Sequence, residues 1–269
     1  MCRSGIIERR PKRRHVVEGR AHVELFGLIG VATYSAVGLI VGLRLLRLAR
    51  RTGEWPERLI GGAFLAGSTF GYPTLVAADR LRAAAPDAAL ILFFAGWTGL
   101  VTAAVCLLAF WQRVYHPDRL AARRTCVVGS VFLVACLFGI VLTHSSGARA
   151  AANPWYLPGL VAQGAAYALN GWAGARYWRM LRRRLSLGLA DPIVVNRILL
   201  WSAAAGAITL QYLYSTSVVV VTGESSVSGF GVALVSSLGL IAAGTMLLAF
   251  FPPRSYLLWL ERGSEGATG

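Results

Sequence analysis

The sequence has few charged residues. Only 14% of its 269 residues are Asp, Glu, Lys or Arg, against roughly a quarter in a soluble domain, and 56% are hydrophobic. The mean hydropathy is +0.58. The net charge of +15 does not indicate nucleic-acid binding, because outside residues 1–20 the arginines stand at the ends of apolar runs. This distribution is typical of membrane proteins, so the lipid bilayer is the expected surroundings and no nucleic acid is expected.

Cysteine and catalytic motifs are also scarce. The four cysteines have no metal-ligand spacing, and three of them lie in or beside apolar runs, which favours a packing role: Cys2, Cys106, Cys126 and Cys136. No H-E-x-x-H or G-x-S-x-G motif is present, and the middle of the apolar segments contains no Asp, Glu, Lys, Arg or His. We therefore expect no enzyme activity, no metal site, no cofactor and no ion-coupled pumping.

Seven apolar segments have the length of about 20 residues that a helix needs to cross a bilayer. They lie near residues 21–43, 59–78, 88–111, 126–143, 155–178, 193–217 and 229–251. Asp191-Pro192 predicts an N-cap followed by proline at the first helical position, and Pro252-Pro253 predicts the end of the last helix. The expected fold is an all-α bundle of seven transmembrane helices.

Arginines gather in alternate connections. They occupy the loops after the first, third and fifth spans and the segment after the last span, whereas the opposite loops hold only Arg80, Arg82 and Arg149. The positive-inside rule therefore places the C-terminus in the cytoplasm and the N-terminus outside an inner (plasma) membrane. The basic tail MCRSGIIERRPKRRHVVEGR disagrees, so we expect either that it is exported or that the true start lies downstream.

One pattern occurs twice. GLRLLRLARR starts at Gly42 and GARYWRMLRRR starts at Gly174. The following spans also match in order. RLIGGAFLAG from Arg58 matches RILLWSAAAG from Arg197, and GLVTAAVCLLAFW from Gly99 matches GLIAAGTMLLAFF. These matches indicate two parallel three-helix repeats joined by an inverting linker helix. The predicted divisions are a basic tail (1–20), repeat 1 (21–124), linker helix 4 (125–153), repeat 2 (154–253) and a short cytoplasmic or interfacial tail (254–269) that includes Trp259.

This 3+1+3 arrangement resembles that of microbial opsins and of SWEET/PQ-loop carriers. The loop text RRRLSLGLADPIVVNR also resembles that of bacterial seven-helix proteins with no assigned activity. An opsin would need a lysine in the seventh span to hold retinal, but the only lysine is Lys12, so a retinal Schiff base is excluded. A carrier of this type would have paired hinge prolines. Pro73 has Tyr212 as its counterpart, which weakens that interpretation.

Neutral polar residues within the spans are the candidates for a ligand cavity between the repeats. Gln163, Tyr167 and Asn170 share one helix face by their i, i+4, i+7 spacing. The full predicted set is Tyr34, Tyr72, Gln163, Tyr167, Asn170, Gln211 and Ser215. A cavity of this composition would bind a small neutral or lipophilic ligand. The other interpretation is that these side chains only form hydrogen bonds between helices.

The basic loops are candidates for contact with anionic lipid headgroups or with a cytoplasmic signalling protein. The predicted residues are Arg44, Arg47, Arg176, Arg179, Arg182, Arg183 and Arg184. The first functional hypothesis is a receptor-like or sensory membrane protein that presents these loops to a partner. The alternatives are a facilitative small-molecule carrier and a structural subunit of a membrane complex.

Overall fold

The computed structural model describes residues 12–145, 149–224 and 230–256, with side chains from His22 onward. Residues 1–11 and 257–269, which include most of the two predicted tails and Trp259, lie outside the described residues. Within the described part every regular element is helical, as the sequence predicts. The elements are α1 (Lys12–Thr52), α2 (Trp55–Ala63), η1 (Phe64–Gly71), α3 (Tyr72–Leu81), α4 (Pro86–Phe110), η2 (Trp111–Tyr115), α5 (Leu120–Thr143), η3 (Ala150–Ala152), α6 (Tyr156–Leu185), α7 (Pro192–Thr222) and α8 (Phe230–Phe250).

Six stretches of helix are long and apolar enough to cross a membrane. They are His22–Thr52, Trp55–Leu81, Pro86–Tyr115, Leu120–Thr143, Pro192–Thr222 and Gly231–Phe250. The fold is therefore that of an integral membrane protein. The sequence predicts seven spans, and the fifth of them is not among these six. It corresponds to α6, which has 30 residues but carries polar and basic side chains along much of its length.

The helix ends follow the local sequence signals. The Asp191 carboxylate accepts a hydrogen bond from the backbone N–H of Ile193 at 2.8 Å, and Pro192 occupies the first helical position of α7. This arrangement confirms the predicted N-cap. At the other end of the chain, α8 ends at Phe250, just before Pro252-Pro253.

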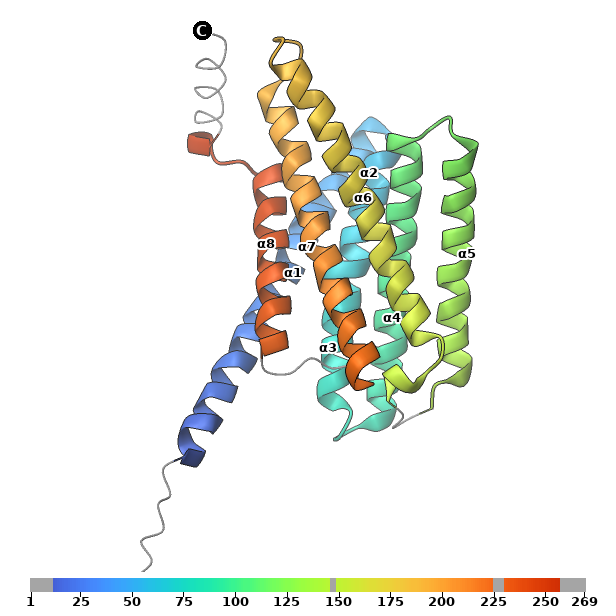
Figure 1. The fold of residues 1–269 in the computed structure, drawn as a ribbon, viewed down its shortest axis with the longest axis vertical. Coiled ribbons are helices and arrows are strands. Elements are labelled where there is room, and N and C mark those ends of the chain that lie inside the picture. Colours follow the sequence, from blue (N-terminus) through green and yellow to red (C-terminus); the bar gives the residue numbers. More distant parts are fainter. Residues whose placement is uncertain (1–11, 146–148, 225–229, 257–269) are drawn as a thin grey trace, which may run out of the picture.

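The helices pack in the order of the chain, and the bundle is closed by α8 lying against α1 (Figure 1). Across the bundle, α4 also packs against α6. The first turns of α1 extend beyond the bundle, at the end opposite to the connection between α6 and α7 (Figure 1). Because both α4 and α6 have neighbours on several sides, they form the centre of the bundle.

The continuous helix formed by α2, η1 and α3 contains an unusually wide turn. Residues Phe64–Gly71 form a π-helix, η1, which joins α2 to α3 without a break. Pro73 lies two residues after the end of η1, and its ring would collide with the Thr69 carbonyl group in a regular α-helix. The wider winding of η1 relieves this crowding. π-Helical segments are frequent at functional sites, and this one places Gly67 at the cavity described below.

Glycines bring η1 and α4 into backbone contact. A Cβ atom on Gly99 would lie 2.6 Å from the carbonyl oxygen of Ala66 and 2.8 Å from the Cα atom of Gly71. A Cβ atom on Gly71 would lie 2.9 Å from the backbone nitrogen of Leu100. Side chains cannot fit between these backbones, so the glycines set the distance between the two helices.

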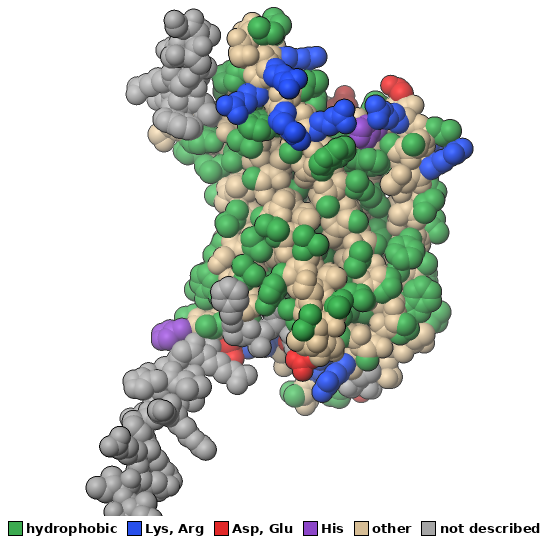
Figure 2. Space-filling view, viewed as in Figure 1, with side chains coloured by type: hydrophobic (Ala, Val, Ile, Leu, Met, Phe, Trp, Pro, Cys, Tyr) green, Lys and Arg blue, Asp and Glu red, His purple; other side chains and the backbone are tan. Residues whose placement is uncertain are grey.

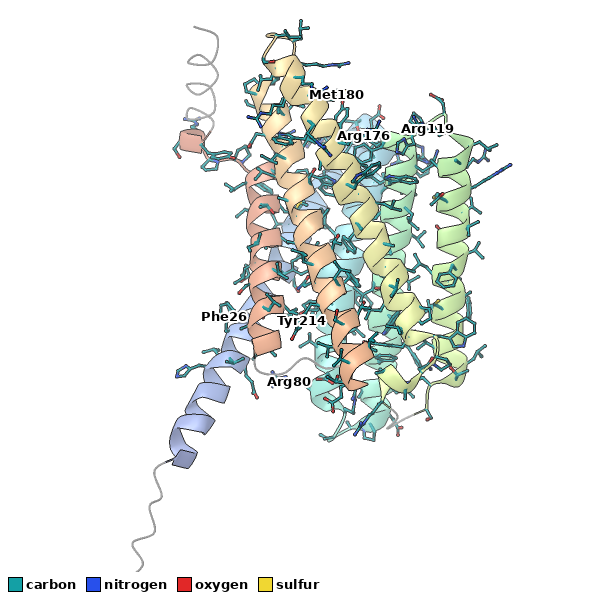
Figure 3. The ribbon with its side chains drawn as sticks, in the orientation of Figure 1. Phe26, Arg80, Arg119, Arg176, Met180 and Tyr214 are labelled. Carbon is teal, nitrogen blue, oxygen red and sulfur yellow. The ribbon has the colours of Figure 1, made fainter. Side chains whose placement is uncertain are left out.

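The two ends of the bundle differ in charge. Arginines of the described loops crowd one end, which we call the arginine-rich end (Figure 2). Figure 3 shows Arg119 and Arg176 at this end and Arg80 at the other, which we call the opposite end. All seven arginines predicted to face lipid or a partner are exposed: Arg44, Arg47, Arg176, Arg179, Arg182, Arg183 and Arg184.

Candidate ligand cavity

A cavity of about 320 Å³ lies in the half of the bundle near the opposite end. Residues of α1, α3, α4, α6, α7 and α8 line it, so it is enclosed by helices from both halves of the chain. Five of the seven predicted cavity residues are among its lining residues: Tyr34, Tyr72, Tyr167, Gln211 and Ser215. The volume is sufficient for a small organic molecule.

Two pairs of tyrosines surround the deep part of the cavity. The rings of Tyr34 and Tyr72 meet edge to face, with centroids 6.1 Å apart, and the rings of Tyr167 and Tyr212 stack, with centroids 5.5 Å apart. Tyr34, Tyr167 and Ile208 also line a second, smaller cavity of about 30 Å³. These three side chains therefore form the floor that separates the two cavities.

The hydroxyl groups of Tyr34, Tyr72 and Tyr167 form no hydrogen bond with any residue that the structure describes. Gln211 uses its Nε2 atom to donate to the Val235 carbonyl oxygen at 2.8 Å. This bond leaves the amide oxygen of Gln211 as an acceptor. Three phenol donors and one amide thus remain for a ligand inside a largely apolar wall.

The other two predicted residues do not line the larger cavity. Gln163 is fully buried, and its Oε1 atom accepts a hydrogen bond from the Tyr212 hydroxyl at 2.9 Å. Asn170 is also fully buried and lines the smaller cavity. Its Nδ2 atom donates to the carbonyl oxygens of Leu107 at 3.1 Å and Ala166 at 2.9 Å. For these two residues, the bonds match the other interpretation, in which the polar side chains of α6 form hydrogen bonds between helices.

Charged residues surround the mouth of the cavity. Arg82 pairs with Asp79 at 3.4 Å, and Arg80 pairs with Glu24 of α1 at 3.4 Å. Asp79, Arg80 and Arg82 are all lining residues. Because the side chains of both ion pairs are about half exposed to solvent, each pair contributes little to stability. The paired charges make the mouth polar without a large excess of either sign.

His144 also lines the mouth, where its ring packs on Phe93 with centroids 4.9 Å apart. Burial lowers the pKa of His144 below its ordinary value, and the positive charge of Arg82 lowers it further. The imidazole is therefore neutral at pH 7. In this form it offers one donor and one acceptor to a ligand at the mouth.

The aromatic part of the lining was not among the residues predicted from the sequence. Phe93 and Trp97 lie one turn apart on α4, and Tyr156 of α6 meets Trp97 with ring centroids 5.2 Å apart. Within an apolar span these residues resemble ordinary packing or lipid-facing side chains. The i, i+4 spacing of Phe93 and Trp97 was the available signal, because it places both rings on one face of the helix.

The cavity is closed toward the arginine-rich end. Trp201 of α7 packs against Phe64 and Phe110, with ring centroids 6.2 and 5.8 Å apart, and Phe110 packs against Tyr115. Ala103, Ala204 and Ala242, all fully buried, complete this cluster. A molecule in the cavity therefore reaches one end of the bundle only.

Among the residues that the structure describes, no group of three or more His, Cys, Asp or Glu side chains is placed to hold a metal ion. The comparisons with family models, curated proteins and solved structures give no match for this chain.

Proposed function

We propose that this chain is a receptor-like membrane protein that binds a small, largely apolar ligand with hydrogen-bond acceptors. The observation that carries the proposal is the cavity of about 320 Å³, which has a mouth at the opposite end and phenol hydroxyls at its floor. Aromatic walls favour a flat or lipophilic molecule, and hydroxyl donors without partners favour carbonyl or ether oxygens on it. Ligand response would be passed to a cytoplasmic signalling protein through the arginine-rich end.

The proposal includes seven membrane crossings, with α6 as the fifth. Three observations support this topology. α6 is as long as the neighbouring spans, it packs against α4, α5 and α7, and it runs from Tyr156 at the cavity mouth to the arginine-rich end. Arg176 lies near that end (Figure 3). The positive-inside rule then places the N-terminus outside and the arginine-rich end in the cytoplasm of a bacterial inner membrane.

The proposal also includes the two parallel repeats, α1–α4 and α6–α8, with α5 as the linker. Under this equivalence α1 corresponds to α6 and α4 corresponds to α8. The contact of α1 with α8 and the contact of α6 with α4 then become the same interface in two copies. Both contacts are present, which supports the repeat. The tyrosine pairs support it too, because Tyr34 and Tyr72 come from the first two helices of one repeat, and Tyr167 and Tyr212 from those of the other.

One observation favours a facilitative carrier as the second candidate. The smaller cavity continues beyond the tyrosine floor toward Asn170 and Trp201. Rotation of Tyr34 and Tyr167 would join the two spaces and lengthen the path into the bundle. A receptor needs no such path, so uptake of solute by proteoliposomes separates the two candidates.

Binding can be tested with prodan, a neutral naphthalene ketone whose fluorescence reports its surroundings. We expect saturable energy transfer from tryptophan to prodan in the purified chain, because Trp97 borders the cavity. Ser215→Trp should abolish the saturable component by filling the cavity. Ser217→Trp is the matched control, because Ser217 lies on the same helix but is exposed on the outside of the bundle. Equal binding by both variants would contradict the proposed site.

A further inference from the structure

The arginine-rich end carries positive charge that the described residues do not neutralise. Both side-chain ion pairs between described residues, Arg80 with Glu24 and Arg82 with Asp79, lie at the opposite end. No arginine at the arginine-rich end forms an ion pair with a described carboxylate, and this includes Arg119, although Asp118 is its neighbour in the chain. With no described carboxylate paired to these arginines, an anion from outside the chain can serve as their counter-charge.

Three of these basic groups converge between α4, α5 and α6. His116 follows η2, and its ring packs on Trp111 with centroids 5.0 Å apart. Arg119 is the N-cap residue of α5, and its backbone N–H donates to the His116 carbonyl oxygen at 3.3 Å. Arg176 comes from α6 (Figure 3). Trp111, on which the His116 ring packs, also packs against Ala173, three residues before Arg176 on α6, so this contact brings the α6 arginine toward the imidazole. In agreement with this arrangement, burial lowers the pKa of His116, and the charges of Arg119 and Arg176 lower it further.

Apolar side chains flank this cluster. Trp111, Ala122 and Ala173 form a small buried core that joins η2, α5 and α6. Next to it on α6, Trp172 is 54% exposed, and its ring lies 5.8 Å from the Arg176 guanidinium carbon. On α5, Val128 is 67% exposed. The cluster is thus a cationic site at the border of a surface that faces lipid tails.

We propose that His116, Arg119 and Arg176 form a binding site for the phosphate of an anionic phospholipid. Guanidinium groups bind phosphate oxygens through paired N–H donors, and the neutral imidazole adds one more donor. The acyl chains would lie along the exposed apolar residues of α5 and α6. A free phosphate ion would gain nothing from this apolar border, so the lipid is the expected occupant.

The test uses the full chain in nanodiscs of phosphatidylcholine. Phosphatidylglycerol with brominated acyl chains is added, because bromine quenches nearby tryptophans, and brominated phosphatidylcholine serves as the reference lipid. We expect preferential quenching by the anionic lipid, with Trp172 as its main reporter, so that Trp172→Phe removes most of the preference. The double variant Arg119→Gln/Arg176→Gln should lower the preference about tenfold.

Arg123→Gln/Arg124→Gln is the matched control. It removes the same charge from exposed positions of α5, and it should lower the preference about twofold at most. If both double variants lose the preference for the anionic lipid equally, the lipid is attracted by the overall charge of this end, and the proposed site is overturned. Displacement of the brominated lipid by inorganic phosphate would overturn the assignment to lipid. Unchanged quenching by brominated phosphatidylcholine verifies that each variant remains inserted and folded.

Discussion

In the first half of the chain, η1 meets α4 backbone to backbone at Gly71 and Gly99. In the second half, α6 meets α7 through a side chain. The Cβ atom of Tyr212 lies 2.9 Å from where a Cβ atom on Gly164 would be, and the Tyr212 hydroxyl donates to Gln163. Backbone contacts have one arrangement, whereas a side-chain contact can change rotamer. The contact of η1 with α4 is therefore fixed, whereas the contact of α6 with α7 at Tyr212 can change when a ligand binds.

The largest expected difference between the halves is in the effect of a glycine-to-alanine substitution on stability. Gly99→Ala should destabilise the protein by about 3 kcal/mol, because the new methyl group meets backbone atoms that cannot move aside. Gly206→Ala in α7 is the control, since no atom lies within 4 Å of the new Cβ position. That change should stabilise the protein by about 0.5 kcal/mol through the higher helix propensity of alanine. Unfolding in mixed micelles measures both effects, and equal effects would remove the distinction between the halves.

A smaller effect is expected from the hydrogen bond in the second half. Gln163→Leu leaves the buried Tyr212 hydroxyl without its acceptor and should cost about 1 kcal/mol. Tyr34→Phe in the first half removes a hydroxyl that has no partner among the described residues, so stability should change little. Prodan binding should instead weaken in Tyr34→Phe, because a donor at the cavity floor is lost. A stable Gln163→Leu variant would mean that this bond does not hold α6 and α7 together.

The smallest expected effect concerns pH. The pKa of His144 is lowered in the folded protein, so the unfolded chain binds its proton first as the pH falls. Above about pH 6.5 the imidazole is neutral in both states and contributes no pH dependence. Below that pH the folded protein loses stability relative to the unfolded chain.

His144→Gln should remove this part of the acid sensitivity. The thermal midpoint of the variant should therefore fall less than that of the wild type between neutral and mildly acidic pH. The comparison cancels the contributions of the other titrating groups, which are the same in both proteins. Parallel curves for the two proteins would show that His144 is not held in its neutral form.

The sequence predicted features that depend on local or periodic signals. Asp191-Pro192 marks the start of α7, and the apolar runs mark the spans that the structure contains. The prediction for the polar face of α6 was only partly specific. The i, i+4, i+7 spacing places side chains on one face of the helix, but it does not identify the neighbour that each side chain contacts. Tyr167 reaches the cavity, whereas Gln163 and Asn170 contact α7 and α4.

Other features depend on three-dimensional packing, and no local sequence pattern predicts them. The π-helix η1 follows from crowding at Pro73 together with the approach of α4, which the sequence does not specify. Trp97 belongs to the cavity because Tyr156, distant in the chain, packs against it. By hydropathy α6 is not among the six candidate spans, and its two buried carboxamides are compensated in part by hydrogen bonds with α7 and α4.

This compensation has a consequence for biogenesis. On the proposed topology, α6 is too polar to partition into lipid by itself, and its carboxamides find their partners on α4 and α7. The translocon would then have to retain α6 until α7 emerges, so that the two enter the bilayer as a hairpin. Stalling synthesis between these helices would leave α6 outside the membrane, although its own sequence is complete.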